Sequence, residues 1–206
     1  YSGFKKLIKK TLLMVFIIVF FGTTLRAEKI SLSNLSTYLE SIKKVSGSFT
    51  QFNSDKTVST GRIFLFRPGR MRMEYKTPDN SLVIVGGSQI AVFDSKSNTH
   101  PKVFPLRKTP LKILLEKKIN LKAKGIVIRH EKVEDFTVLL LKDPKLSSYG
   151  SLKLIFTDHP VNLRQWVITN EMGDQTVLKF KDFMNQPNMS SNKFDISLEI
   201  DNRVFD

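Results

Sequence analysis

The sequence predicts an α+β fold in which one antiparallel sheet curls around two helices. Short alternating or apolar runs recur at steps of roughly ten residues, and turn signals such as Pro68-Gly69 and Asp143-Pro144 separate them. Two other segments carry apolar residues at helical spacing. A sheet of about ten twisted strands tends to curl, and the inside of a half-closed barrel must be filled. The two amphipathic helices are the available filling.

The strands follow one another with short connections. Pro68-Gly69 and Gly86-Gly87 are typical of hairpin turns. Strands are expected over residues 48–52, 62–66, 71–75, 82–85, 89–94, 126–130, 137–141, 151–157, 163–169 and 176–181, with a last extended segment over 194–198. No gap is long or polar enough to be a linker between domains, so residues 28–206 are expected to form a single domain.

The first helix is expected over residues 31–45. Its apolar residues recur at three- and four-residue steps, and they are Leu32, Leu35, Leu39 and Ile42. Lys43 and Lys44 fall in the expected last turn, where cations favour the helix dipole, and Gly47 is expected to end the helix.

The second helix is expected after Thr109-Pro110, a capping residue followed by proline at the first helical position. Leu111, Leu114 and Leu115 then form an apolar stripe. This spacing indicates a short helix that crosses the sheet.

Residues 1–27 have the three-part layout of a secretory signal peptide. A lysine-rich start precedes an unbroken apolar run over residues 12–21, and Ala27 offers a small residue at a plausible cleavage site. That run, at about 1.5 Å per residue, covers only about half of a bilayer core, which disfavours a membrane anchor. We therefore expect residues 1–27 to be removed and residues 28–206 to be exported.

The formal charge of +14 at first suggests a polyanion as partner. Five of the cations belong to the expected signal peptide, which has no acid. Residues 102–129 hold nine cations against the single acid Glu116, so the rest of the exported chain is nearly neutral. Lys117, Lys118 and Lys122 are interpreted as a docking patch for an acidic partner or for anionic headgroups. The alternative is a solvated helix face, and no nucleic-acid partner is expected.

Residues that carry catalytic chemistry are scarce. The absence of cysteine excludes disulfides, thiol nucleophiles and cysteine-ligated metals. His100 and His159 each precede a proline, and His130 stands in an expected strand. No nucleophile elbow, zinc-binding helix motif, phosphate loop or calcium loop occurs. We therefore expect no enzymatic activity, no cofactor and no metal site, although a secreted hydrolase stays a competing hypothesis.

Large flexible apolar side chains stand on the expected strands. Met71, Met73 and Tyr75 alternate with polar residues and share one face. They are either ordinary core or the lining of a pocket that accepts lipid chains. The spacing leaves both interpretations open.

Arg67 shares a face with Ile63 and Leu65 when the strand is counted by twos. If that face lies inside, the guanidinium must find backbone carbonyls or a carboxylate. If the strand ends at Pro68, the side chain is solvated instead.

Several segments resemble one known family. Residues 46–51, Ser-Gly-Ser-Phe-Thr-Gln, are similar to an opening strand, and residues 61–75 contain a strand that ends in Arg-Pro before a second apolar strand. Thr109-Pro110-Leu111 with Leu114-Leu115 resembles a lid helix, and residues 163–166 and 173–176 resemble a late strand and its turn. Together they resemble the outer-membrane lipoprotein carrier protein (LolA) family over nearly the whole exported chain.

The resemblance implies an unclosed half-barrel of about ten to eleven strands with a helical lid over a hydrophobic cavity. It implies a periplasmic carrier, active as a monomer, whose cargo is acylated lipoproteins. The carrier takes its cargo from an inner-membrane ATP-driven releasing complex and passes it to an outer-membrane receptor, or to the outer membrane directly. A lipid-binding sensor or regulatory module on the same half-barrel is the alternative.

The resemblance also implies roles for particular residues. Arg67 corresponds to a latch that bonds backbone carbonyls of the lid and keeps the empty cavity closed. The positions expected to line the cavity or lid are Phe49, Ile63, Leu65, Met71, Met73, Tyr75, Leu111, Leu114 and Leu115. Lys112 departs from the apolar residue of some family members, so the apolar face of the lid is expected to be narrower here.

Overall fold

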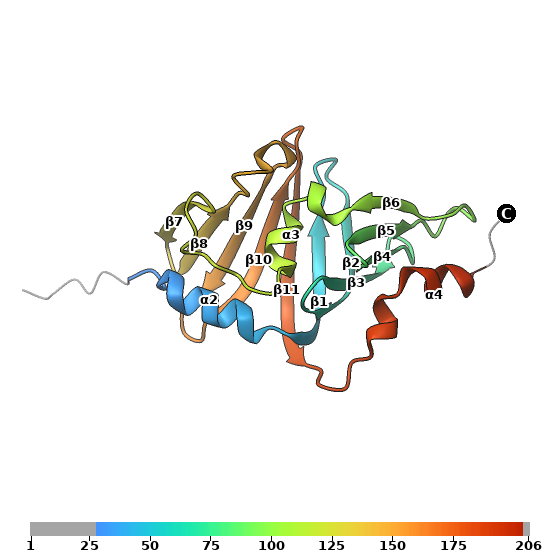
Figure 1. Ribbon diagram of the computed structural model, residues 1–206, viewed down its shortest axis with the longest axis horizontal. Coiled ribbons are helices and arrows are strands. Elements are labelled where there is room, and N and C mark those ends of the chain that lie inside the picture. The colour runs from blue at the N-terminus through green and yellow to red at the C-terminus, as the bar shows by residue number, and fades with distance from the viewer. Residues whose placement is uncertain (1–27, 204–206) are drawn as a thin grey trace, which may run out of the picture.

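An eleven-stranded antiparallel sheet bends around two helices in the computed structural model, which describes residues 28–203 (Figure 1). The predicted signal peptide, residues 1–27, lies outside the described residues. The strands are β1 (Lys44–Phe52), β2 (Val58–Phe66), β3 (Arg70–Thr77), β4 (Leu82–Gly86), β5 (Gln89–Phe93), β6 (Lys102–Pro105), β7 (Val127–Val133), β8 (Phe136–Leu141), β9 (Ser151–Thr157), β10 (Asn162–Thr169) and β11 (Gln175–Asn185). The predicted α+β half-barrel is confirmed.

Two runs of hairpins form the sheet, in the order β6-β5-β4-β3-β2-β1-β11-β10-β9-β8-β7. The runs meet where β1 pairs with β11, and the unpaired edges are β6 and β7, so the barrel is not closed. Strand β6 was not predicted, because it is only four residues long and mostly exposed. The chain between the two edges passes through η1 (Leu106–Lys108) and α3 (Leu111–Leu115), which Figure 1 shows in front of the sheet.

Helix α2 (Leu32–Ser41) is shorter than predicted. Ser31 caps it by accepting a hydrogen bond from the Asn34 N–H at 3.2 Å, and Leu35 and Leu39 are buried. The prediction that the helix continues to Val45 and ends at Gly47 is wrong. Both residues lie in β1, because pairing with β2 and β11 satisfies the backbone from Lys44 onward.

The cap of helix α3 lies one residue later than predicted. Pro110 stands at the capping position and the Thr109 hydroxyl donates to the Leu106 carbonyl at 3.0 Å, closing the η1 turn instead. The predicted apolar stripe of Leu111, Leu114 and Leu115 is buried, together with Ile113.

The C-terminal segment corrects another prediction. Residues 194–198 do not form one extended segment, because Phe194 ends η3 (Ser191–Phe194) and residues 196–198 begin α4 (Ile196–Asp201). Asp195 caps α4 by accepting from the Leu198 N–H at 3.1 Å. Ile196 and Ile200, one helical turn apart, cover a small cluster on the outer face of the sheet. Its members are Leu82, Ile84, Ala91 and Phe93.

Candidate functional site

The apolar interior of the curved sheet is the first part of the site. Strands β1, β2 and β3 place five predicted cavity residues in one buried cluster, and they are Phe49, Ile63, Leu65, Met71 and Met73. Leu111, Leu114 and Leu115 of α3 belong to the same cluster. The structure therefore brings these eight residues together, and their proposed contact with lipid stays a prediction.

Tyr75, the ninth predicted cavity residue, lies at the border of this cluster. Its ring meets Phe49 edge to face at 5.1 Å between centroids, and its hydroxyl donates to Gln51 Oε1 at 2.8 Å. Burial raises the pKa of Tyr75 to about 12, against the lowering effect of the Gln51 hydrogen bond. The phenol therefore stays neutral and joins the apolar wall to a polar edge.

Strands β8 to β11 form the opposite wall, which the sequence reasoning did not assign to the site. Leu152, Leu154 and Phe156 alternate along β9 and are fully buried, and Trp166 of β10 packs edge to face on Phe180 at 4.6 Å. The period-two pattern of β9 was the available signal. Leu35 and Leu39 of α2 belong to the same cluster, so the helices fill the space between the two walls.

Arg67 joins the two helices that fill the interior. Its side chain is only 8% exposed, so the solvated alternative does not apply. One guanidinium nitrogen donates to the Leu39 carbonyl near the end of α2. The other donates to the Glu116 carbonyl at the end of α3, at 2.6 Å. A single side chain thus holds the C-terminal ends of both helices.

The backbone around Arg67 adds two further bonds. The Arg67 N–H donates to the Lys43 carbonyl, and the Gly69 N–H donates to the Leu115 carbonyl, each at 2.8 Å. Burial lowers the pKa of Arg67, and the negative charge of Glu40 partly offsets this effect. The cation also suits the negative ends of the two helix dipoles.

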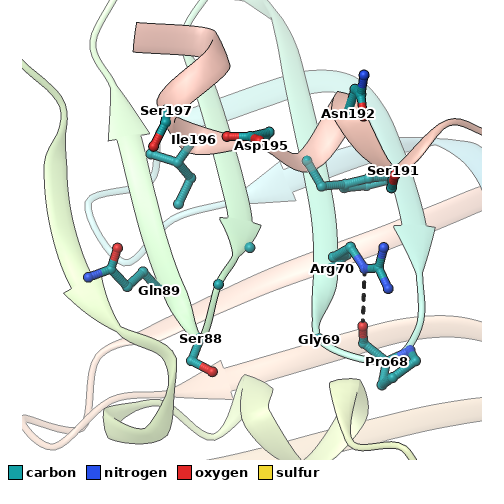
Figure 2. Close-up of a pocket in the computed structure, with 13 residues that line it drawn as sticks. Pro68, Gly69, Arg70, Ser88, Gln89, Ser191, Asn192, Asp195, Ile196 and Ser197 are labelled. Atoms are coloured by element: carbon teal, nitrogen blue, oxygen red, sulfur yellow. Dashed lines mark hydrogen bonds between the residues drawn. The ribbon is translucent and has the colours of Figure 1, made fainter.

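The outer side of the same turn faces the C-terminal segment. Figure 2 shows Pro68, Gly69 and Arg70 across a pocket of about 570 Å³ from Ser191 to Ser197. Arg70 donates from Nε to the Pro68 carbonyl at 3.5 Å and its guanidinium stacks on Phe66. Arg67 and Arg70 stand at the two ends of this turn. Arg67 contacts α2 and α3 on the inner side, and Arg70 contacts Pro68 and Phe66 on the outer side.

Comparison with known proteins identifies the family. Residues 40–197 match the family model described as outer membrane lipoprotein carrier protein LolA. The chain belongs to the LolA family. Its predicted resemblance is confirmed, and the family is one of lipoprotein carriers.

Similar proteins cover most of the chain. An outer-membrane lipoprotein carrier protein of Francisella philomiragia is 27% identical over 182 residues, which are 84% of this chain and 87% of the relative. A Coxiella burnetii protein with the same description is 23% identical over 170 residues, 80% of this chain and 78% of the relative. A solved LolA superfamily protein from Nitrosomonas europaea aligns with a TM-score of 0.43 and 11% identity, covering 81% of this chain and 98% of that one.

The predicted docking patch of this LolA-family protein lies beside Arg67. Lys117 and Lys118 are exposed and line a cleft of about 350 Å³ together with Lys43, Glu40 and Arg67. Lys118 and Lys122 line a second cleft of about 300 Å³ against α2. Lys117 and Lys118 therefore lie beside the helix ends that Arg67 contacts, and Lys122 lies along α2. Their contact with a partner stays a prediction.

Lys112, the polar residue of α3, is paired with acids. Its ammonium lies 3.2 Å from Glu116 and 3.5 Å from Asp143, and these partners raise its pKa against the opposing effect of burial. The buried face of α3 consists of its four other residues.

His130 lies against the backbone just before α2. The Nε2 atom of His130 is 2.8 Å from the Ile30 carbonyl, and burial lowers the pKa of His130. Among residues 28–203, no group of three or more metal-ligating side chains comes together. Within the same range, no helix has the length and apolar character needed to cross a bilayer.

Proposed function

We propose that this protein is a periplasmic carrier that binds the acyl chains of lipoproteins released from the inner membrane and delivers them to the outer membrane. The observation that carries the proposal is the apolar interior between two sheet walls, filled by two helices that Arg67 holds at their ends. Displacing helices from such an interior exposes an apolar surface of the kind that acyl chains need.

The hydrogen bonds of Arg67 to the ends of α2 and α3 give the carrier a moderate affinity for its cargo. Each CH₂ group that leaves water contributes about 0.8 kcal/mol, so fully sheltered acyl chains would bind too tightly for delivery. A closed state stabilised by Arg67 competes with cargo for the same interior. Its stability is subtracted from the free energy of cargo binding, which keeps release fast enough for transfer.

The partners follow from the same proposal. An inner-membrane ATP-driven complex loads the carrier, and an outer-membrane receptor or the outer membrane itself unloads it. The basic patch of Lys117, Lys118 and Lys122 offers a docking surface beside Arg67, so that contact with an acidic partner would occur close to the helix ends.

The test is to express the full sequence with its leader and isolate the product from the periplasm. Mass spectrometry of the purified protein should detect co-purifying acylated lipoprotein, and depletion should leave lipoproteins in the inner membrane. Isolation without acylated cargo, together with normal lipoprotein sorting after depletion, would refute the proposal. Binding of acyl lipid without any transfer to outer-membrane vesicles would favour the lipid-sensor alternative.

A further inference from the structure

Trp166 carries a buried hydrogen-bond donor that has no partner. The side chain is 0% exposed, and its indole Nε1 makes no hydrogen bond. Leaving a buried donor unpaired destabilises the folded state, and a buried tryptophan N–H usually finds an acceptor. An unpaired buried donor therefore calls for an explanation, and one explanation is that it forms a hydrogen bond when the interior is open.

The cross-strand and ring neighbours of Trp166 are apolar. Leu154 and Leu178 are the cross-strand neighbours of Trp166 on β9 and β11, and the Phe180 ring lies 4.6 Å from it. A buried water needs two to four polar partners, which these side chains do not offer. A largely apolar molecule that carries an acceptor would therefore complete this bond.

A surface pocket lies along β10, close to Trp166. Ile168, two residues further along β10, lines a pocket of about 410 Å³ between η1 and the β10–β11 turn. Phe104 and Met172 line the same pocket and are 49% and 78% exposed. Two residues of a strand span about 7 Å. A lipid whose polar end stays in this pocket would place its first carbonyl groups near the depth of Trp166.

We propose that the Trp166 indole N–H donates a hydrogen bond to an ester or amide carbonyl of a bound acyl chain. The inference rests on the proposed carrier function, since the helices must move before a chain can reach β10. It assigns Trp166 two effects. The bond favours acylated lipids over hydrocarbon or ether-linked chains, and it sets the depth to which the chains enter.

The experiment uses the fact that Trp166 is the sole tryptophan of the chain, so that its indole N–H gives a single resonance in a ¹⁵N-labelled sample. The probes are a synthetic lipopeptide with two ester-linked palmitoyl chains and its ether-linked counterpart. The ester probe should shift the indole proton downfield and bind about 5- to 30-fold more tightly than the ether probe, the ratio expected for one hydrogen bond. Trp166→Phe should bind both probes with equal affinity.

The outcomes separate the two proposals. Equal affinity of the wild-type protein for both probes, without an indole shift, would overturn the role of Trp166 and leave the carrier function standing. Failure of both probes to bind would overturn the carrier function itself. These readouts come from the wild-type protein, so they hold even if Trp166→Phe folds poorly.

A third probe identifies the source of the carbonyl. Ester-linked dipalmitoylphosphatidylglycerol shares its glycerol esters with the lipopeptide but lacks the cysteine. An indole shift with both lipids would support a bond to the glycerol ester, and a shift with the lipopeptide alone would support a bond close to the cysteine.

Discussion

Replacing Arg67 by leucine should make the carrier retain its cargo. The substitution removes both side-chain bonds to the Leu39 and Glu116 carbonyls and leaves an apolar side chain of suitable size. The interior residues that would contact acyl chains are unchanged. We therefore expect cargo to bind normally and to leave slowly.

The size of the effect follows from the two contacts. A hydrogen bond from a charged donor contributes about 1.5–3 kcal/mol, so the pair is worth about 3–6 kcal/mol before other costs. Removing the guanidinium from water costs free energy and opposes this gain. The Arg67→Leu variant does not have that desolvation cost. If the closed state loses about 2–3 kcal/mol of stability, the affinity for cargo should rise about 30- to 150-fold.

The assay measures dissociation of a fluorescent dipalmitoyl lipopeptide into acceptor vesicles. Arg70→Leu is the matched control, because it removes a cation from the same turn without touching α2 or α3. Arg67→Lys should be intermediate, since an ammonium lacks the planar fork that reaches two carbonyls. Release from Arg67→Leu as fast as from wild type would show that Arg67 does not act as a latch.

Three other substitutions test the fold and the site. Gly61→Ala should lower the melting temperature more than Gly69→Ala does, because a methyl group at Gly61 would lie 2.3 Å from the Glu74 carbonyl oxygen, whereas Gly69 has nothing within 4 Å and only a positive φ of 70°; equal losses would contradict this packing. Stability should fall as pH rises from 10 toward 12, because the folded state holds the Tyr75 phenol neutral and raises its pKa from 10.0 to about 12. In denaturant titrations, Tyr75→Phe should lose less unfolding free energy than the wild type between pH 10 and 12. An unchanged pH profile would contradict the role of Tyr75 in this loss. Reversing the charges of Lys117, Lys118 and Lys122 should slow cargo transfer and flatten its salt dependence, and unchanged kinetics would exclude the docking patch.

The shared face of Arg67, Ile63 and Leu65 could be predicted from the sequence, because strand parity depends only on counting residues. The partners of Arg67 could not. They depend on where α2 and α3 end, and the two carbonyls lie 28 and 49 residues away along the chain. Local periodicity carries no information about such distances.

The wrong predictions share one physical cause. Helical spacing continues through Ile42, but long-range pairing with β2 and β11 makes Lys44 and Val45 start a strand. Residues 194–198 are expected to be extended, yet Asp195 caps a helix there whose two isoleucines are half-buried against the sheet. Trp166 was visible as a residue, whereas its lack of an acceptor depends on side chains from two other strands. In each case tertiary contacts outweigh the local pattern.

The position of β11 in the sheet has a consequence for folding. This strand is the last of the eleven along the chain, yet it joins the two halves of the sheet by pairing with both β1 and β10. Gln186, just beyond β11, hydrogen-bonds to Ser46 across 140 residues. Until β11 is in place, β1 and β10 are both open edges that can pair with other chains. Contacts of such long range make assembly slow, so the rate-limiting step of folding should be the insertion of β11 between them.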